Sequence, residues 1–119
     1  MNKISTFYAN IYVGLREGYD NKHLSINRVH GVCRTFCNKV KLCVTVTPTT
    51  YHYVDGRENG AIVGLINYPR FPATPAEIKQ KAIDLARILK KDLKQKRVSI
   101  VMPNETIMIG ERRIEVTKQ

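Results

Sequence analysis

The fold is decided by residues 42–72, which read LCVTVTPTTYHYVDGRENGAIVGLINYPRFP. Apolar and polar side chains alternate over residues 42–47, which is typical of a strand with one apolar face. Asp55-Gly56 and Asn59-Gly60 both tolerate positive φ, so we expect the chain to reverse between them. Residues 61–66 are apolar on both faces, which indicates a central strand that is covered on two sides. The stretch therefore predicts a long β-hairpin.

Helical patterns flank this hairpin. Residues 24–40 place apolar side chains at three- and four-residue steps, and Ser25 is suited to cap their start. A second helix begins at Thr74, where a capping box is followed by proline at the first helical position. Further strands are expected over residues 11–15, 98–102 and 106–109, with an additional one at 114–116.

The order β-α-β-β-α-β-β predicts an α+β fold. We expect a two-layer sandwich in which two helices cover one face of a mostly antiparallel sheet, with residues 1–119 forming a single domain. Because residues 61–66 are apolar on both faces, the uncovered face of the sheet also needs burial. A homo-oligomer is the simplest way to supply it.

Composition indicates a globular protein with affinity for anions. The 119 residues carry a net charge of +10, and 43% of them are apolar. No apolar run approaches the length of a membrane span, and the first residues lack the apolar core of a signal peptide, so we expect a cytosolic protein without a membrane partner. Cys33, Cys37 and Cys43 fit no trusted zinc spacing and are interpreted as small buried residues.

The sequence contains no recognisable catalytic constellation. Its three histidines stand outside the common metal and nucleophile motifs, and there is no P-loop, Rossmann fingerprint or Gly-x-Ser-x-Gly elbow. The carboxylates Glu17, Asp20, Asp55 and Glu58 fall in expected turns, where solubility explains them. These absences predict a protein that is not an enzyme and that uses no metal or cofactor.

The candidate ligand-binding residues are arginines, aromatic rings and one amide. Arginine grips phosphates, aromatic rings stack on bases, and an amide reads base or ribose edges. Without a general base, this set favours a nucleotide-phosphate binder that does no chemistry, although each residue also suits an ordinary surface. The set comprises Arg16, Tyr19, Arg57, Asn67, Tyr68, Arg70, Phe71, Arg112 and Arg113.

Four stretches resemble a known family. They are IYVGLREGY (residues 11–19), LCVTVTPT (42–49), IVGLINYPRFP (62–72) and RVSIV (97–101). They resemble small phage proteins of the first class of Thoeris anti-defence sponges, over about residues 10–110. That resemblance implies a hexamer in the cytoplasm of an infected bacterial host.

The resemblance also implies a function. Such proteins sequester cyclic ADP-ribose isomers without cleaving them, and members are described as binding cyclic di- or trinucleotides of the kind used in CBASS at a separate site. The net charge of +10 suits such anionic ligands. The alternative is a small basic protein that binds nucleic acid, which the charge favours and the scattered aromatic residues favour less.

Overall fold

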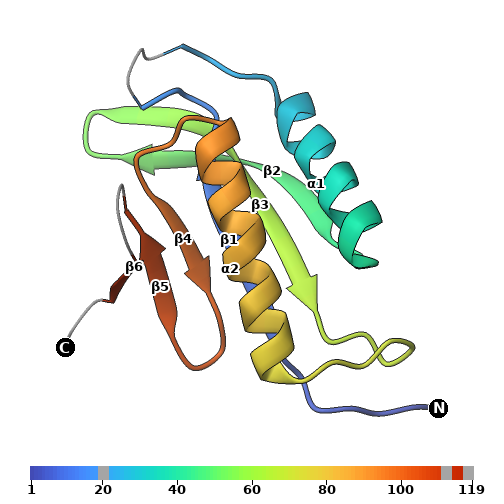
Figure 1. Cartoon of the computed structure of the whole chain (residues 1–119). Coiled ribbons are helices and arrows are strands. Elements are labelled where there is room, and N and C mark those ends of the chain that lie inside the picture. Colours follow the sequence, from blue (N-terminus) through green and yellow to red (C-terminus); the bar gives the residue numbers. More distant parts are fainter. Residues whose placement is uncertain (19–21, 111–113, 117–119) are drawn as a thin grey trace.

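The computed structural model describes residues 1–18, 22–110 and 114–116. Within them the chain forms two helices and six strands, in an order that matches the expected one (Figure 1). The elements are β1 (Tyr8–Gly14), α1 (Ile26–Val40), β2 (Thr45–Tyr53), β3 (Gly56–Ile66), α2 (Pro75–Asp92), β4 (Val98–Val101), β5 (Thr106–Ile109) and β6 (Ile114–Val116).

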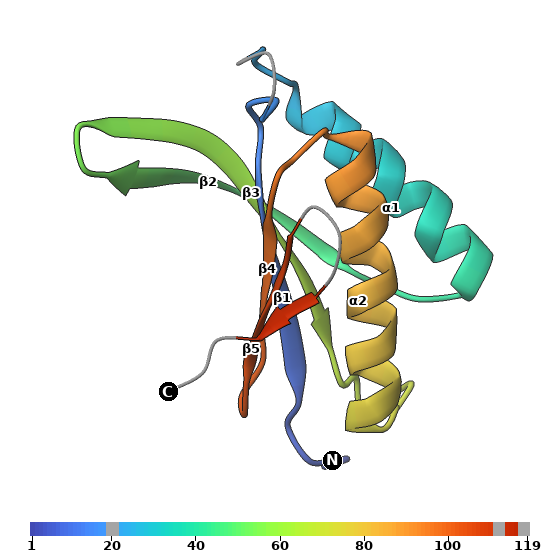
Figure 2. The same ribbon diagram turned by 60° about the vertical axis from the view of Figure 1, so that its left-hand side comes forward.

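The strands form one sheet in the order β2-β3-β1-β4-β5-β6, and each pair of neighbours is antiparallel. The first four strands and the two helices have the arrangement of the split βαβ, or ferredoxin-like, motif. Both helices lie on the same side of the sheet (Figure 2). The α+β prediction is confirmed.

The helix-start signals act as the sequence predicts. At α1 the Ser25 hydroxyl accepts a hydrogen bond from the Asn27 N–H at 3.1 Å, and at the other end Lys41 takes a left-handed conformation with φ of 56°. At α2 the Thr74 hydroxyl accepts from the Glu77 N–H, and the Glu77 carboxylate accepts from the Thr74 N–H, both at 3.1 Å. This reciprocal pair is the predicted capping box.

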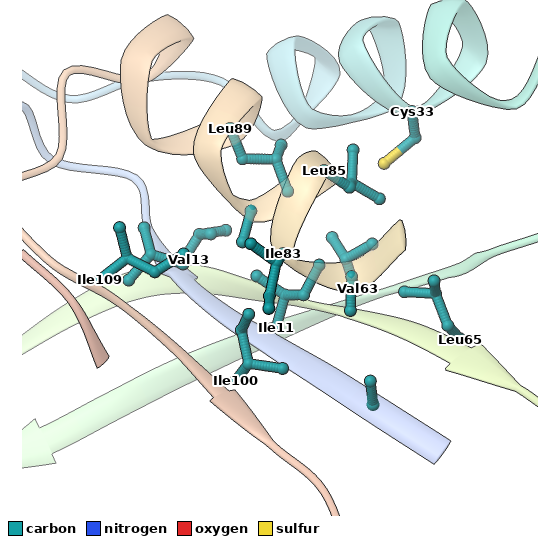
Figure 3. Packing of buried hydrophobic residues seen from close by; sticks show 14 of the residues in the cluster. Ile11, Val13, Cys33, Val63, Leu65, Ile83, Leu85, Leu89, Ile100 and Ile109 are labelled. Carbon is teal, nitrogen blue, oxygen red and sulfur yellow. The ribbon is translucent and has the colours of Figure 1, made fainter. Parts of the chain in front are cut away.

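The hydrophobic core lies between the helices and the sheet. Ile11, Val63 and Ile100 project from three neighbouring strands, and Leu85 and Leu89 meet them from α2 (Figure 3). Each of these five side chains is fully buried. Burying a side chain of this size stabilises a fold by about 1.5–3 kcal/mol, so this layer holds the sheet against α2 and fixes the positions of the strand ends.

The hairpin reverses at a different place from the expected one. The turn falls at Val54–Asp55, where Asp55 has φ of 58°, and Asn59-Gly60 lies inside β3. Glycine is required at position 60 for another reason. A Cβ there would collide with the ring of Tyr51 and would lie 2.5 Å from the Val13 carbonyl oxygen. A close tertiary contact, rather than a turn, therefore accounts for this glycine.

Two smaller expectations also need correction. β1 begins at Tyr8 rather than at residue 11, because Phe7 and Ala9 already contribute to the core. Of the three cysteines that were interpreted as small buried residues, Cys33 is buried, Cys37 is half-buried, and Cys43, which precedes β2, is exposed. The interpretation therefore holds fully for Cys33 alone.

One face of the sheet is left uncovered by the helices. Alternation along the paired strands places these side chains on it: Tyr8, Asn10 and Tyr12 from β1, Thr45, Thr47, Thr49 and Tyr51 from β2, Glu58, Ile62 and Ile66 from β3, and Ser99, Val101 and Met108 from β4 and β5. We call this the open face. On the described strands β1–β5, Glu58 is its one charged side chain. The expectation that strand 61–66 is covered on both sides is thus met on the helix side only.

Candidate active site

Three segments meet at the end of the sheet where β1 stops. The Leu15 N–H donates to the Asn59 carbonyl oxygen at 2.9 Å, which ties the end of β1 to the base of the β2–β3 hairpin. The Gly18 N–H donates to the Lys94 carbonyl oxygen at 2.9 Å, which ties the same segment to the turn after α2. These backbone contacts bring side chains from distant parts of the sequence to one end of the open face.

Glu58 and Gln95 occupy the space above Gly14. Their side-chain oxygens, Glu58 Oε2 and Gln95 Oε1, both lie against the point that a Cβ on Gly14 would occupy, the second at 2.9 Å from it. Gly14 pairs with Gly60 across the strands, so neither residue has a side chain that would fill this space. We call the group formed by Gly14, Glu58, Gly60 and Gln95 the glycine notch.

Tyr51 closes one side of the glycine notch. Its ring lies over Gly60, and its hydroxyl donates to the Val13 carbonyl oxygen at 3.0 Å and contacts the Ala61 carbonyl oxygen at 3.3 Å. Burial, together with the nearby Glu58 carboxylate as a smaller cause, raises the pKa of Tyr51 to about 12. Tyr51 is therefore a neutral hydrogen-bond donor at physiological pH, and Glu58 lies within electrostatic reach of it.

Alkaline titration tests this placement. Because the pKa of Tyr51 is about 12 in the folded chain and its ordinary value is 10, its contribution to folding is present below pH 10 and is lost as the pH rises towards 12. We expect the free energy of unfolding to fall over that window, and Tyr51→Phe to reduce the fall. Urea denaturation at pH 9 and pH 11 measures both. Identical pH dependence in the two proteins would contradict the assignment.

Buried charged groups lie beside the notch. The Glu17 side chain is only 6% exposed, and its Oε1 lies 3.6 Å from Lys94 Nζ, beyond hydrogen-bond distance. Among the residues that the structure describes, Arg16 Nε and Glu17 Oε1 are buried without a hydrogen-bond partner. The interpretation of Glu17 as a solubility residue in a turn does not fit this burial. Buried polar atoms are rarely left without a hydrogen-bond partner, so this corner of the fold is unusual.

The predicted ligand residues fall at both ends of the sheet. Arg16 lies next to the glycine notch, whereas Asn67, Tyr68 and Phe71 follow β3 at the other end. The seven residues of β1 separate the two groups by roughly 20 Å. Arg57 lies next to Glu58 in β3 and is exposed. Tyr19, Arg112 and Arg113 lie outside the described residues. The predicted set is therefore not one site.

The loop after β3 has a structural role of its own. Asn67 Nδ2 donates to the Ser5 carbonyl oxygen, and its Oδ1 accepts from the Ala73 N–H, both at 2.9 Å. Arg70 stacks on Phe71, with the guanidinium carbon 5.4 Å from the ring centre. Tyr68 and Phe71 line a groove of about 550 Å³ between this loop, the end of α1 and the start of α2. Asn67 thus holds the loop in place, and its amide is occupied by backbone partners.

The residues that form the glycine notch were not predicted from the sequence to belong to a site. Glu58 was assigned to a turn, but it lies in β3 and is half-buried. Gln95 follows α2 and no local pattern in the sequence marks it, although the residue is only 8% exposed and its side chain bonds to the backbone of Arg16, 79 positions away. The available signal was the register of the hairpin: a turn at Val54–Asp55 places Glu58 opposite Tyr51.

Two other features bear on function. Among the described residues, no cluster of three histidine, cysteine or carboxylate side chains is arranged to hold a metal ion. None of the described helices is both long and apolar enough to span a membrane.

Two solved structures share the fold of this chain. One is a phage SAM lyase in complex with S-methyl-5'-thioadenosine, with a TM-score of 0.72, 19% sequence identity, and coverage of 93% of this chain and 95% of that one. The other is a phage SAM lyase in the apo state, with a TM-score of 0.70, 17% identity, and coverage of 97% and 98%. No protein-family model and no curated protein matches the sequence.

These neighbours correct the functional prediction. The expected non-cleaving sponge for cyclic nucleotides was wrong, and so was the expectation that the chain is not an enzyme, because the solved proteins that share this fold over nearly their whole length are lyases. The ligand of one of them is a thioadenosine rather than a cyclic nucleotide. The resemblance to the Thoeris anti-defence family is itself tested by none of the comparisons and stays a prediction.

Proposed function

We propose that this chain is a lyase that cleaves S-adenosylmethionine (SAM) and releases S-methyl-5'-thioadenosine (MTA). The observation that carries this proposal is the agreement in fold with a SAM lyase over 93% of this chain and 95% of the other. The glycine notch adds support, because it offers a half-buried carboxylate and a neutral tyrosine at one end of an otherwise uncharged sheet face.

The chemistry of the reaction makes modest demands on the protein. Release of MTA from SAM breaks the bond between the sulfonium sulfur and Cγ of the aminocarboxypropyl chain, and sulfur leaves with the electron pair as a neutral thioether. The carboxylate of the substrate can attack Cγ and close a five-membered lactone, which balances atoms and charge without a further reactant. The protein must then hold a flexible chain in a curled conformation, a task worth many orders of magnitude in rate.

The notch suits a cationic substrate in a protein that otherwise favours anions. The net charge of the chain is +10, so a ligand with positive charge needs a local carboxylate. Glu58 supplies one, and it forms no ion pair with another described residue. The ring of Tyr51 borders the same space and offers an aromatic surface of the kind that attracts cations. We assign Glu58 and Tyr51 to substrate binding and positioning.

Conversion of SAM tests the proposal. Purified protein is incubated with SAM, and SAM and MTA are separated by chromatography over time. We expect SAM to disappear and MTA to appear in equal amounts, at a rate proportional to protein concentration. Unchanged SAM after prolonged incubation would contradict the proposed function.

We also propose that copies of the chain associate through the open face. Its centre is formed by the half-buried side chains of tyrosine, isoleucine and methionine residues with little charge, which is the composition of an interface core. The resemblance found in the sequence implies a hexamer. Such an assembly would place a second copy at the edge of the glycine notch. We place its activity in the cytoplasm of an infected bacterial host, where SAM is made and used.

Introduction of a charge on the open face tests the assembly. Ile62→Glu puts a carboxylate at the centre of the open face, whereas Ile88→Glu puts one on the exposed surface of α2, where the wild-type side chain is already 44% exposed. We expect Ile62→Glu to elute as a monomer in size-exclusion chromatography and Ile88→Glu to elute with the wild type, because a buried unpaired carboxylate is strongly unfavourable. Equal elution of all three proteins as oligomers would contradict the interface.

A further inference from the structure

The orientation of the Gln95 amide is fixed by the backbone. Its Nε2 donates to the Arg16 carbonyl oxygen at 2.8 Å and to the Leu93 carbonyl oxygen at 3.0 Å, which uses both N–H groups of the amide. The residue is only 8% exposed. Oε1 must therefore point in the opposite direction, which is into the glycine notch, where it lies 2.9 Å from the point that a Gly14 Cβ would occupy.

The notch thus holds two hydrogen-bond acceptors with no donor between them. Glu58 Oε2 lies on one side of the Gly14 position and Gln95 Oε1 on the other. Among the described residues, none donates a hydrogen bond to either oxygen. Two acceptors that face the same space repel each other unless a donor or a cation separates them. A small cationic donor between them would satisfy both oxygens at once.

We infer that this group is the α-ammonium of the aminocarboxypropyl chain of the substrate, seated above Gly14 between Glu58 Oε2 and Gln95 Oε1. This inference rests on the proposed function and names the part of the substrate that these residues bind. An ammonium carries three N–H donors and satisfies both oxygens, whereas the sulfonium of SAM has no N–H group. Charge-assisted hydrogen bonds of this kind are about twice as strong as neutral ones.

This assignment gives Gln95 and Gly14 defined roles. Gln95 becomes a specificity-determining residue that requires a free amino group on the ligand. Gly14 provides the space, because any side chain there would displace both oxygens. Holding the ammonium also fixes the neighbouring carboxylate of the substrate, so the same contact would help to turn that carboxylate towards Cγ.

Binding of two uncleaved ligands tests the inference. S-adenosylhomocysteine keeps the aminocarboxypropyl chain on a neutral sulfur, and MTA lacks that chain. We expect calorimetry to show that the wild type binds S-adenosylhomocysteine more tightly than MTA. Gln95→Met should lower the affinity for S-adenosylhomocysteine by about tenfold, which is the effect of one lost charge-assisted hydrogen bond. The affinity for MTA should stay within about twofold of the wild-type value.

Two further variants make the test decisive. Gln80→Met changes an exposed glutamine of α2 that bonds only to Asp84, and it should alter neither affinity. Gly14→Ala puts a methyl group in the notch, where it displaces Glu58 Oε2 and Gln95 Oε1 and occupies the place of the ammonium, so it should reproduce the selective loss even where Gln95→Met fails to fold. Circular dichroism checks the fold of each variant.

The outcomes separate this inference from the proposed function. Equal losses for both ligands in Gln95→Met and Gly14→Ala would overturn the inference, as would a wild type that converts SAM to MTA yet binds S-adenosylhomocysteine no better than MTA. A wild type that binds neither ligand and leaves SAM intact would instead overturn the proposed function, and the inference with it.

Discussion

Replacement of Glu58 by glutamine is expected to slow the conversion of SAM to MTA by roughly 100-fold, the usual cost of losing a group that positions a substrate. The substitution keeps the size of the side chain and one acceptor oxygen, and it removes the charge. Because Glu58 lies against Gly14 and forms no ion pair with another described residue, folding does not depend on that charge. The rate of MTA formation at saturating SAM measures the effect.

A matched control separates this effect from a general change of charge. Glu105→Gln removes a carboxylate in the turn between β4 and β5. This carboxylate forms an ion pair with Lys79, at 3.0 Å, on the surface of the protein. It should leave the rate unchanged, since exposed ion pairs contribute little to stability. Activity of Glu58→Gln at the level of Glu105→Gln would remove Glu58 from the active site and leave the glycine notch without a function.

Truncation of Leu85 is expected to cost about 2–5 kcal/mol of unfolding free energy. Leu85 is fully buried where α2 meets the sheet (Figure 3), so Leu85→Ala removes apolar contacts and leaves a cavity that the rigid strands cannot close. Urea denaturation of both proteins at the same protein concentration measures the loss, because association would make stability depend on concentration.

Ile88→Ala is the comparison for this substitution. Ile88 lies one turn further along α2 and is 44% exposed, so its truncation should cost well under half as much. If Leu85→Ala cost no more than Ile88→Ala, the layer between α2 and the sheet would not be the main source of stability.

Local sequence signals were sufficient for the class of fold. The alternation over residues 42–47 and the capping box at Thr74 predicted a hairpin and a helix that the structure confirms. The position of the turn was missed because Asn59-Gly60 is as good a turn signal as Asp55-Gly56. The choice between them is made by the ring of Tyr51, which needs a glycine beneath it at position 60. That contact is tertiary and has no local signature.

The site was harder to predict for the same reason. Once the turn was misplaced, Glu58 seemed to be a solvated loop residue, whereas the true register puts it opposite Tyr51 on the open face. Gln95 depends on a hydrogen bond to Arg16, a residue 79 positions earlier, which no periodicity reveals. The arginine and aromatic residues that composition favoured are divided between the two ends of β1. Composition therefore identified ligand-like chemistry without identifying its location.

The most direct test of the proposed lyase is nuclear magnetic resonance of SAM labelled with ¹³C in its methyl group, mixed with the wild-type protein. Cleavage at Cγ changes the labelled group from a sulfonium methyl to a thioether methyl, so we predict that the first signal decays and the signal of MTA grows at the same rate. Glu58→Gln should slow both changes together. If the sulfonium signal persists at a protein concentration comparable to that of SAM, whether it is broadened by binding or unchanged, the proposed lyase activity is contradicted.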